Sequence, residues 1–229
     1  MRVFVAGANQ GLGLVLSRLV AEKGHTVYAG ARREFSLGLL RAAAEFPGLR
    51  PLELDVTSEE AAAKAAEGIA DGGGDLDAVI VVAGILPESD KRLPVTDADI
   101  GDLRRTIEAN AVGSAIIIKH FHSLVRDGGT FMLVSSEAGS MTHVGAGYPG
   151  YSVSKAAQNK LAAVLAKTVS RYKVYALHPG RMNTEMGREN AQIEPEEAAL
   201  GIWRIISGEK EISPEKGWFI DYRGEAMDI

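Results

Sequence analysis

The stretch Ala6-Gly7-Ala8-Asn9-Gln10-Gly11-Leu12-Gly13 decides how the fold begins. It follows the apolar run Val3–Ala6 and leads into Leu12–Lys23, where apolar residues recur at helical spacing. Glycines at such a junction let the backbone turn tightly and approach a pyrophosphate, which the N–H groups and dipole of a helix N-terminus favour. The spacing Gly-x3-Gly-x-Gly differs from the commoner Gly-x-Gly-x-x-Gly. The motif predicts a dinucleotide-binding strand–turn–helix unit, and a glycine-rich turn without a ligand is the alternative.

Short apolar runs alternate with longer Ala- and Leu-rich segments along the whole chain. A uniformly apolar run is typical of a strand that is covered on both faces. The repetition predicts an α/β fold, a Rossmann-type doubly wound parallel sheet of about seven strands with helices on both faces. No linker divides the chain, so we expect a single domain over residues 1–229. The expected strands are Val3–Ala6, Thr26–Gly30, Arg50–Leu54, Ala78–Val82, Thr130–Ser135, Lys173–Leu177 and Gly217–Ile220.

The helices are expected from apolar spacing and from signals at their ends. Thr57 and Glu60 match the capping-box pattern, so Thr57 is the predicted N-cap of a helix over Ser58–Ala70. One long helical stretch is expected over Ile100–Val125. The other expected helices are Leu12–Lys23, Leu37–Phe46, Tyr151–Ser170 and Pro195–Ser207.

The composition excludes several classes of protein. With 46% hydrophobic and 24% charged residues among 229, the chain has enough apolar material for a sizeable core. The net charge of −5 argues against a nucleic-acid or anionic-membrane partner. There is no cysteine, which excludes disulfides, thiolate nucleophiles and Cys-ligated zinc, and no metal site is expected. No apolar run approaches the ~20 residues of a membrane span, and no secretory signal is evident, so we expect a cytoplasmic protein.

The end of the second expected strand bears on which dinucleotide is bound. An NAD enzyme usually has an acidic residue there, which binds the ribose 2′-hydroxyl. Here Ala31 is followed by Arg32 and Arg33. A guanidinium can bind a 2′-phosphate in bidentate fashion, and no carboxylate repels it. The sequence favours NADP(H) and leaves NAD(H) possible. The alternative interpretation of Arg32 and Arg33 is a solvated basic pair at the start of a helix.

Two further pairs of residues suggest chemistry. Tyr151 and Lys155 stand four apart in an expected helix and therefore share a face. A nearby ammonium stabilises phenolate, so we expect the pKa of Tyr151 to lie below its usual value of about 10. Ser135 and Ser136 follow the fifth expected strand, where ligands of open α/β sheets lie. Each pair alone is weak evidence for an active site. A Tyr-x3-Lys pair can arise by chance, and a turn or helix-cap serine is an equally good explanation of Ser135 and Ser136.

Together the motifs resemble the short-chain dehydrogenase/reductases over nearly the whole chain. The matching pieces come in that family's order: Gly7/Gly11/Gly13, Leu54-Asp55-Val56, Ala83-Gly84, Asn110, Ser135-Ser136, Tyr151 with Lys155, and His178-Pro179-Gly180 with Thr184. Within the family the sequence is most similar to the sniffer-like and C-factor-like carbonyl reductases. Three departures stand out: Val81-Val82 replaces Asn-Asn, Ala6 replaces the usual Thr, and Ser136 stands further before Tyr151 than usual.

The resemblance implies a catalytic set of Asn110, Ser136, Tyr151 and Lys155. Tyr151 would exchange a proton with the substrate oxygen, to which Ser136 would hydrogen-bond. Lys155 would lower the pKa of Tyr151 and bind the nicotinamide ribose, and Asn110 would hold a water that links Lys155 to solvent. The implied cofactor-binding residues are Gly7, Asn9, Gln10, Gly11, Leu12, Gly13, Arg32, Arg33, Asp55, Val56, Ala83, Gly84, Tyr151, Lys155, Pro179, Gly180 and Thr184.

We therefore expect an enzyme that uses NADPH to reduce a ketone or aldehyde to an alcohol. An NAD-linked alcohol dehydrogenase on the same fold and a dinucleotide-binding signalling or regulatory protein with incidental turnover are the alternatives. Residues 181–194 are the expected substrate loop. The resemblance also implies a homodimer or homotetramer paired through the helix Tyr151–Ser170.

Overall fold

Seven strands form one sheet in the part of the chain that the computed structural model describes, residues 1–32, 34–187, 191–213 and 217–229. The strand order is β3-β2-β1-β4-β5-β6-β7, and every neighbouring pair is parallel. The strands are β1 (Arg2–Ala6), β2 (Thr26–Ala31), β3 (Leu49–Glu53), β4 (Leu76–Val81), β5 (Val125–Val134), β6 (Lys173–His178) and β7 (Phe219–Asp221).

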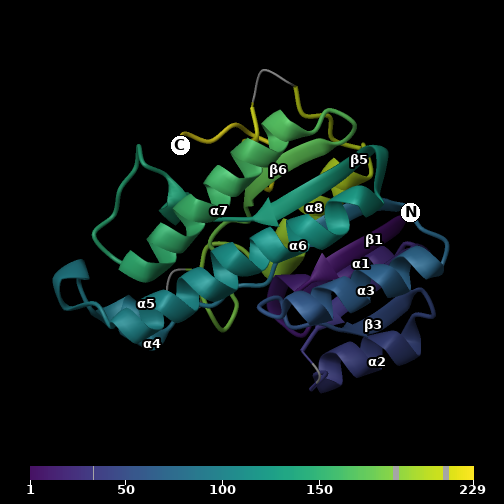
Figure 1. Ribbon diagram of the computed structural model, residues 1–229, viewed down its shortest axis with the longest axis horizontal. Helices are drawn as coiled ribbons and strands as arrows, with labels where there is room; N and C mark the ends of the chain where they lie inside the picture. Colours follow the sequence, from purple (N-terminus) through teal and green to yellow (C-terminus); the bar gives the residue numbers. More distant parts are fainter. Residues whose placement is uncertain (33, 188–190, 214–216) are drawn as a thin grey trace.

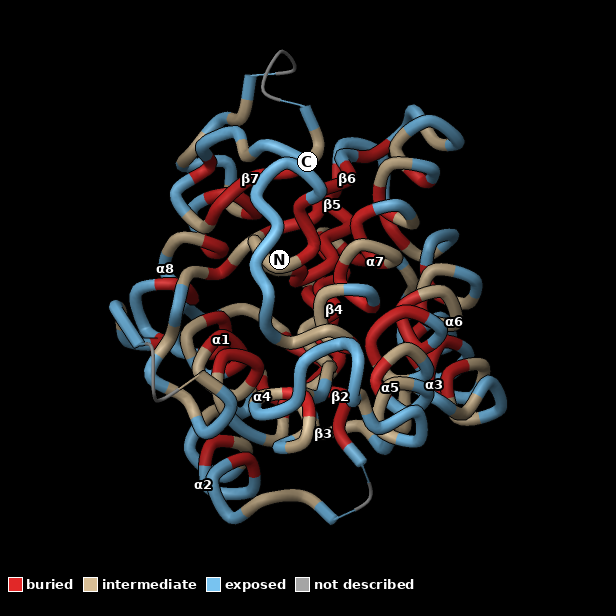
Figure 2. Tube along the Cα trace, turned by 90° about the vertical axis from the view of Figure 1, so that its left-hand side faces the viewer, coloured by how far each residue is buried: buried red, intermediate tan, exposed pale blue. Residues whose placement is uncertain are grey.

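Helices cover both faces of this sheet, as Figures 1 and 2 show. On one face α1 (Gly11–Glu22), α2 (Leu37–Glu45) and α8 (Pro195–Ile206) bury their apolar residues with those of the strands. The other face is covered by α3 (Glu59–Asp71), α6 (Gly113–Phe121) and α7 (Pro149–Thr168). Because side chains alternate along a strand, the central strands contribute to both apolar layers, which explains the apolar runs in β1 and β4 and in the second half of β5.

The strand order reverses at β1, and this reversal positions the site. The chain runs outward from β1 through β2 to β3 and then crosses to β4 on the other side of β1. The loops after β1 and β4 therefore diverge, which opens a crevice beyond the carboxyl ends of these two strands.

The expected fold class is confirmed, and most strands and helices lie close to their predicted ranges. The fifth strand is longer than predicted, since β5 begins at Val125 and not at Thr130. The predicted N-cap of α3 is wrong by one residue. The Ser58 hydroxyl accepts the hydrogen bond from the backbone N–H of Ala61, at 3.2 Å. Thr57 instead donates both its hydroxyl, at 2.7 Å, and its backbone N–H, at 2.9 Å, to the Asp55 carboxylate. These two bonds form a tight turn before the helix and occupy the Thr57 side chain.

The predicted long helix over Ile100–Val125 is wrong in its continuity. It divides into α5 (Ile100–Ile107), a π-helical turn over Glu108–Val112, and α6, and a short 3₁₀ turn then leads into β5. A π turn widens a helix by one residue, and such turns often mark functional sites. The short helix α4 (Glu88–Arg92) was not expected. In the described residues no helix has the length and apolar character that a membrane crossing requires.

Candidate active site

The glycine turn joins β1 to α1 with very close backbone packing. Gly7 has a φ of +96°, a conformation that favours glycine, and a Cβ placed on it would lie 2.6 Å from the Ala83 nitrogen after β4. A Cβ on Gly13 would lie 2.0 Å from the Gly7 oxygen. Both positions therefore exclude any side chain, and the turn stays thin enough for a ligand to approach the first N–H groups of α1.

Asn9 fastens this turn to the segment after β2. Its side-chain oxygen accepts a hydrogen bond from the Ser36 N–H at 2.6 Å, and its Nδ2 donates to the Glu34 carbonyl at 2.9 Å. The Ser36 hydroxyl donates to the Asn9 carbonyl at 2.5 Å and also caps α2. The glycine turn is thus bound to the segment that leads into α2.

A cavity of about 810 Å³ runs from the glycine turn across the ends of β1 and β4. Its size falls within the range of roughly 300–1,000 Å³ that is usual for small-molecule and cofactor sites. At its start, α1 has an N-cap, Gln10, that makes no side-chain hydrogen bond to the first turn. The first N–H groups of α1 are therefore available to a phosphate. The lining residues include Gly7, Asn9, Gln10, Gly11, Leu12, Arg32, Asp55, Val56, Ala83, Gly84, Tyr151, Lys155, Pro179 and Thr184.

This cavity brings together most of the residues expected to bind a dinucleotide. The closely packed glycines and the long cavity fit such a ligand. Gly13 does not line the cavity but shapes it from behind. Gly180 lines an adjoining cavity, and Arg33 lies outside the described residues.

Arg32 and Asp55 mark one end of the cavity. The pKa of Asp55 lies below its usual range, chiefly because the Thr57 backbone and hydroxyl donate to it, with a smaller contribution from the charge of Arg32. Arg32 is exposed and lies at the cavity mouth. A guanidinium there has solvent access and can turn toward an anionic ligand.

Tyr151 and Lys155 project from the first turns of α7 toward the same cavity. The Lys155 ammonium nitrogen lies 5.5 Å from the centre of the Tyr151 ring. Lys155 is 3% exposed, and its Nζ donates to the carbonyl of Val134 and to the side-chain oxygen of Gln158, both at 2.8 Å. The two side chains therefore share one face, as their spacing predicted.

Burial sets the pKa values of this pair. It raises the pKa of Tyr151 to about 12, against a smaller opposing effect of a hydrogen bond with Ser136. It also lowers the pKa of Lys155 to about 7. The expected lowering of the Tyr151 pKa is therefore wrong for this structure, because burial of the phenol disfavours the phenolate more than the hydrogen bond with Ser136 favours it.

The neighbouring residues Ser135 and Ser136 at the end of β5 make different contacts. Ser135 is 1% exposed and donates its hydroxyl to the Asn159 side chain at 2.5 Å, so it joins β5 to α7. Ser136 lines the adjoining cavity, hydrogen-bonds with Tyr151, and accepts the Ala138 N–H at 3.1 Å. Of the two, only Ser136 combines a place at the cavity with a hydrogen bond to Tyr151.

Asn110 lies in the π turn between α5 and α6 and is fully buried. Its side chain accepts the Ile85 N–H at 2.7 Å and donates to the Ile85 carbonyl at 3.0 Å and to the Ser154 hydroxyl at 2.9 Å. It thereby joins the loop after β4 to α7. A water held by Asn110 stays a prediction.

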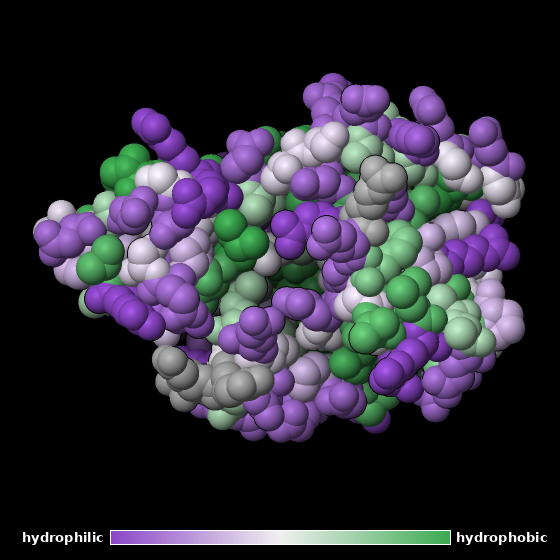
Figure 3. Space-filling view, turned by 90° about the horizontal axis from the view of Figure 1, so that it is seen from below, coloured by the Kyte–Doolittle hydropathy of each residue, from purple (hydrophilic) through white to green (hydrophobic). Residues whose placement is uncertain are grey.

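A second cavity, of about 560 Å³, adjoins the first at Tyr151, Pro179 and Thr184. Its walls combine apolar side chains with charged groups. On the molecule as a whole, the face seen from below has a hollow near its centre, with apolar residues inside and polar ones around them (Figure 3). Arg181 donates to Glu137 at 2.6 Å, so this arginine is already paired. Tyr148, which precedes α7 with a φ of +57°, also lines this cavity.

The expected substrate loop begins and ends in a fixed stem. Met182 and Ile193 form a parallel bridge, the Asn183 N–H donates to the Ile193 carbonyl at 2.8 Å, and the Gln192 N–H donates to the Arg181 carbonyl at 2.7 Å. Residues 188–190 of this loop lie outside the described residues.

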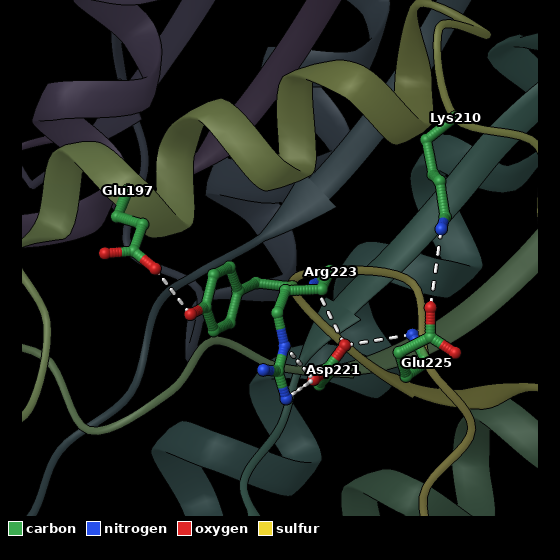
Figure 4. Close-up of polar contacts among 6 residues, drawn as sticks. Glu197, Lys210, Asp221, Arg223 and Glu225 are labelled. Atoms are coloured by element: carbon green, nitrogen blue, oxygen red, sulfur yellow. Dashed lines mark hydrogen bonds and ion pairs between the residues drawn. The ribbon is translucent and has the colours of Figure 1, made fainter.

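The turn after β7 contacts the segment that leads into the stem. Asp221 accepts the Glu225 N–H at 2.9 Å and closes the turn (Figure 4). Tyr222 on this turn packs against Gly180, where a Cβ would lie 3.2 Å from the tyrosine ring. The Tyr222 hydroxyl donates to Glu197 in α8 at 2.6 Å. The turn therefore links the segment after β6 to the first turn of α8.

Sequence reasoning missed Asp90 and Gln158. The two carboxylate oxygens of Asp90 accept the N–H groups of Gly150 and Tyr151, at 2.8 and 2.7 Å. Asp90 is 7% exposed and comes from α4, so it holds the start of the helix that carries Tyr151. The signal for Gln158 was its place three residues after Lys155, where a polar residue faces inward.

Comparisons with known proteins agree with this geometry. Residues 1–195 match the short chain dehydrogenase family. The chain is 31% identical over 223 residues to a 1-hydroxy-2-glutathionyl-2-methyl-3-butene dehydrogenase of Rhodococcus sp. (strain AD45), covering 93% of this chain and 92% of that protein. A carbonyl reductase of Pseudomonas aeruginosa PAO1 in complex with NADP is 27% identical, with a TM-score of 0.84 over 100% of this chain and 99% of that one. The carbonyl reductase Sniffer of D. melanogaster has the same fold, with a TM-score of 0.87, 24% identity and coverage of 100% and 99%.

Proposed function

This chain belongs to the short chain dehydrogenase family of NAD(P)-dependent oxidoreductases, and on that premise we propose that it reduces a ketone or aldehyde to an alcohol with NADPH. One observation carries the proposal. Tyr151 lies where the two cavities meet, with Lys155 behind it in the larger cavity and Ser136 beside it in the smaller one. A carbonyl oxygen in the smaller cavity would therefore meet a proton donor next to a dinucleotide site.

The chain's own residues supply the proton and hold the substrate oxygen. When bound in the larger cavity, the reduced dinucleotide supplies the hydride for the carbonyl carbon. Tyr151 gives its hydroxyl proton to the carbonyl oxygen, and Ser136 hydrogen-bonds to that oxygen. The raised pKa of Tyr151, about 12, keeps the phenol protonated at neutral pH, as a proton donor requires. A charged Lys155 stabilises the phenolate that forms.

The preference for NADPH rests on Arg32. No acidic side chain follows Ala31, and Arg32 lies exposed at the cavity mouth near Asp55. The related carbonyl reductase of Pseudomonas aeruginosa PAO1 was solved with NADP.

The lining of the smaller cavity favours neutral substrates. Charged groups there have partners within the chain: Arg181 pairs with Glu137, and His143 lies 3.3 Å from Asp228. The apolar part of the wall consists of Leu86, Tyr148, Met182, Met186 and Met227. Methionine side chains are flexible and adapt to irregular shapes, so we propose broad tolerance of small or flat carbonyl compounds.

The test is NADPH oxidation with a panel of aldehydes and ketones, with NADH measured side by side. Tyr151→Phe should abolish turnover and leave NADPH binding nearly intact, because it removes only the hydroxyl. Tyr172→Phe is the matched control, since the Tyr172 hydroxyl is buried without a hydrogen-bond partner and should be dispensable. Tyr151→Phe activity within tenfold of wild type would contradict the assignment.

The same assay separates the alternatives. Turnover with NADH but not NADPH would favour an NAD-linked alcohol dehydrogenase. Tight NADPH binding without turnover across the panel would favour a binding or regulatory protein.

A further inference from the structure

A buried chain of hydrogen bonds extends behind Lys155, away from the cavity. Lys155 Nζ donates to Gln158 Oε1 at 2.8 Å, and Gln158 Nε2 donates to the Ser114 hydroxyl at 2.8 Å. The Ser114 hydroxyl in turn donates to the Asn110 carbonyl at 2.7 Å. Gln158 and Ser114 are both fully buried. The chain therefore lies in a dry part of the fold, between α7 and the turn that precedes α6.

Each link fixes the orientation of the next one. The Asn110 carbonyl can only accept, so the Ser114 proton points to it, and the Ser114 oxygen is left as an acceptor. Gln158 must then turn its NH₂ group toward Ser114, which turns its oxygen toward Lys155. The opposite orientation would set amide N–H groups against the lysine donors. The sequence of donors thus runs in one direction, from Lys155 to Asn110.

Two of the three donor positions of the lysine are directed by this arrangement. One N–H is bound by the Val134 carbonyl of β5 and another by Gln158. The nitrogen also lies close to the wall of the larger cavity, since a Cβ on Gly84 would be 3.7 Å from it. In a tetrahedral ammonium, the two N–H groups that bind Val134 and Gln158 point away from the cavity. The third N–H therefore points toward the side of Gly84 and Tyr151.

We propose that Gln158 is a positioning residue for Lys155. Gln158 directs the remaining N–H donor of Lys155 toward the cavity, and it stabilises the charged form of the lysine. The inference rests on the proposed function, because it gives Lys155 a task beside Tyr151. Gln158 itself touches neither cavity.

The charged form needs such an acceptor in this environment. Burial alone lowers the pKa of Lys155, to about 7, and no charged group contributes to that shift. Tyr151 is the titratable neighbour on α7. The other charged groups along the walls of the larger cavity are Arg32, Asp55, Arg104, Arg105, Glu108 and Glu185. Hydrogen bonds to a charged donor are about twice as strong as neutral ones, so the loss of Gln158 Oε1 should penalise the ammonium most.

The experiment compares Gln158→Met, Gln158→Glu and Thr106→Val. Methionine keeps the length and removes the acceptor, whereas glutamate keeps an acceptor and adds a negative charge. Thr106 is the control, because it is also fully buried, its hydroxyl donates only to the Asp102 carbonyl, and it lines neither cavity. The first readout is nitrogen NMR of the lysine side chains in the ligand-free protein, with the Lys155 signal identified by its loss in Lys155→Met.

Gln158→Met should move the titration midpoint of Lys155 to lower pH by about one unit or more, and Gln158→Glu should move it to higher pH. In NADPH-dependent reduction, Gln158→Met should lower kcat roughly 10- to 100-fold at neutral pH, with a smaller change in the KM of the carbonyl substrate. Gln158→Glu should retain most of kcat, and Thr106→Val should match wild type in both readouts.

An unchanged Lys155 midpoint in Gln158→Met would overturn the proposal, as would equal losses of kcat in the Met and Glu variants without a pH shift. If Gln158→Met does not fold, the direction of the midpoint in Gln158→Glu decides. The NMR titration needs no substrate. A wild-type protein that reduces no carbonyl compound would thus refute the proposed function, while the titration would still decide the role of Gln158.

Discussion

Asp90 offers the sharpest test of how the fold holds Tyr151. Its carboxylate accepts two backbone N–H groups at the start of α7, one of which belongs to Tyr151 itself. Asp90→Ala removes both acceptors and leaves two N–H groups at a largely buried position. Asp90→Asn keeps one oxygen and removes the charge that favours a helix N-terminus.

The magnitude follows from these two bonds. Loss of an N-cap side chain costs about 0.5–2 kcal/mol, and a bond to a charged group is worth about 1.5–3 kcal/mol. For Asp90→Ala we therefore expect about 2–4 kcal/mol of lost stability. In a chain of this length that corresponds to a fall in Tm of about 4–16 °C. Asp90→Asn should lose about half as much.

Thermal unfolding followed by circular dichroism measures this effect, with Asp99→Ala as the control. The Asp99 side chain caps α5 through a single hydrogen bond from the Asp102 N–H at 2.9 Å, and Asp99 is exposed. Its loss should cost about 1 kcal/mol. We also expect kcat of Asp90→Ala to fall further than its affinity for NADPH, because the glycine turn is untouched. An Asp90→Ala shift no larger than that of Asp99→Ala would refute the reasoning.

Three further predictions follow from the site and its surface. Arg32→Ala should weaken NADPH binding by roughly 10- to 150-fold and NADH binding far less, as measured by fluorescence titration, whereas equal effects on both cofactors would remove Arg32 as the reader of the 2′-phosphate. Between pH 7 and 10 the Tm of wild type should rise relative to that of Lys155→Met. The reason is that the folded-state pKa of Lys155 is about 7, whereas the unfolded chain keeps that proton up to about pH 10. Parallel curves of Tm against pH for the two proteins would contradict the lowered pKa. Light scattering should give a dimeric or tetrameric mass, since Val153 and Val164 leave apolar surface exposed on α7, and a monomeric mass at working concentration would exclude pairing through this helix.

The parts of the fold that were predicted correctly depend on short-range patterns. Uniform apolar runs identify buried parallel strands, and the glycine spacing after β1 identifies a turn that no side chain can enter. The i, i+4 spacing of Tyr151 and Lys155 predicted a shared face without any knowledge of the sheet. In each case the physical cause lies within one element or one turn.

The parts that were missed depend on residues far apart in the sequence. Asp90 and Tyr151 are joined only when α4 meets α7, and Gln158 meets Ser114 only across the packed helices. The pKa of Tyr151 was predicted in the wrong direction because sequence spacing supplies the neighbouring charge but not the degree of burial. The π turn at Asn110 likewise has no sequence signal that separates it from an ordinary helix.

The paired stem at Met182 and Ile193 has a consequence for how this protein can diversify. Both sides of the stem are fixed by backbone hydrogen bonds, and Tyr222 anchors the adjoining Gly180. Changes in length between the two sides would therefore cost little beyond loop closure, about 0.6 kcal/mol for each doubling of the loop. We therefore predict that the segment between the two sides of the stem can be exchanged between relatives as a unit while the glycine turn and Tyr151 stay in place.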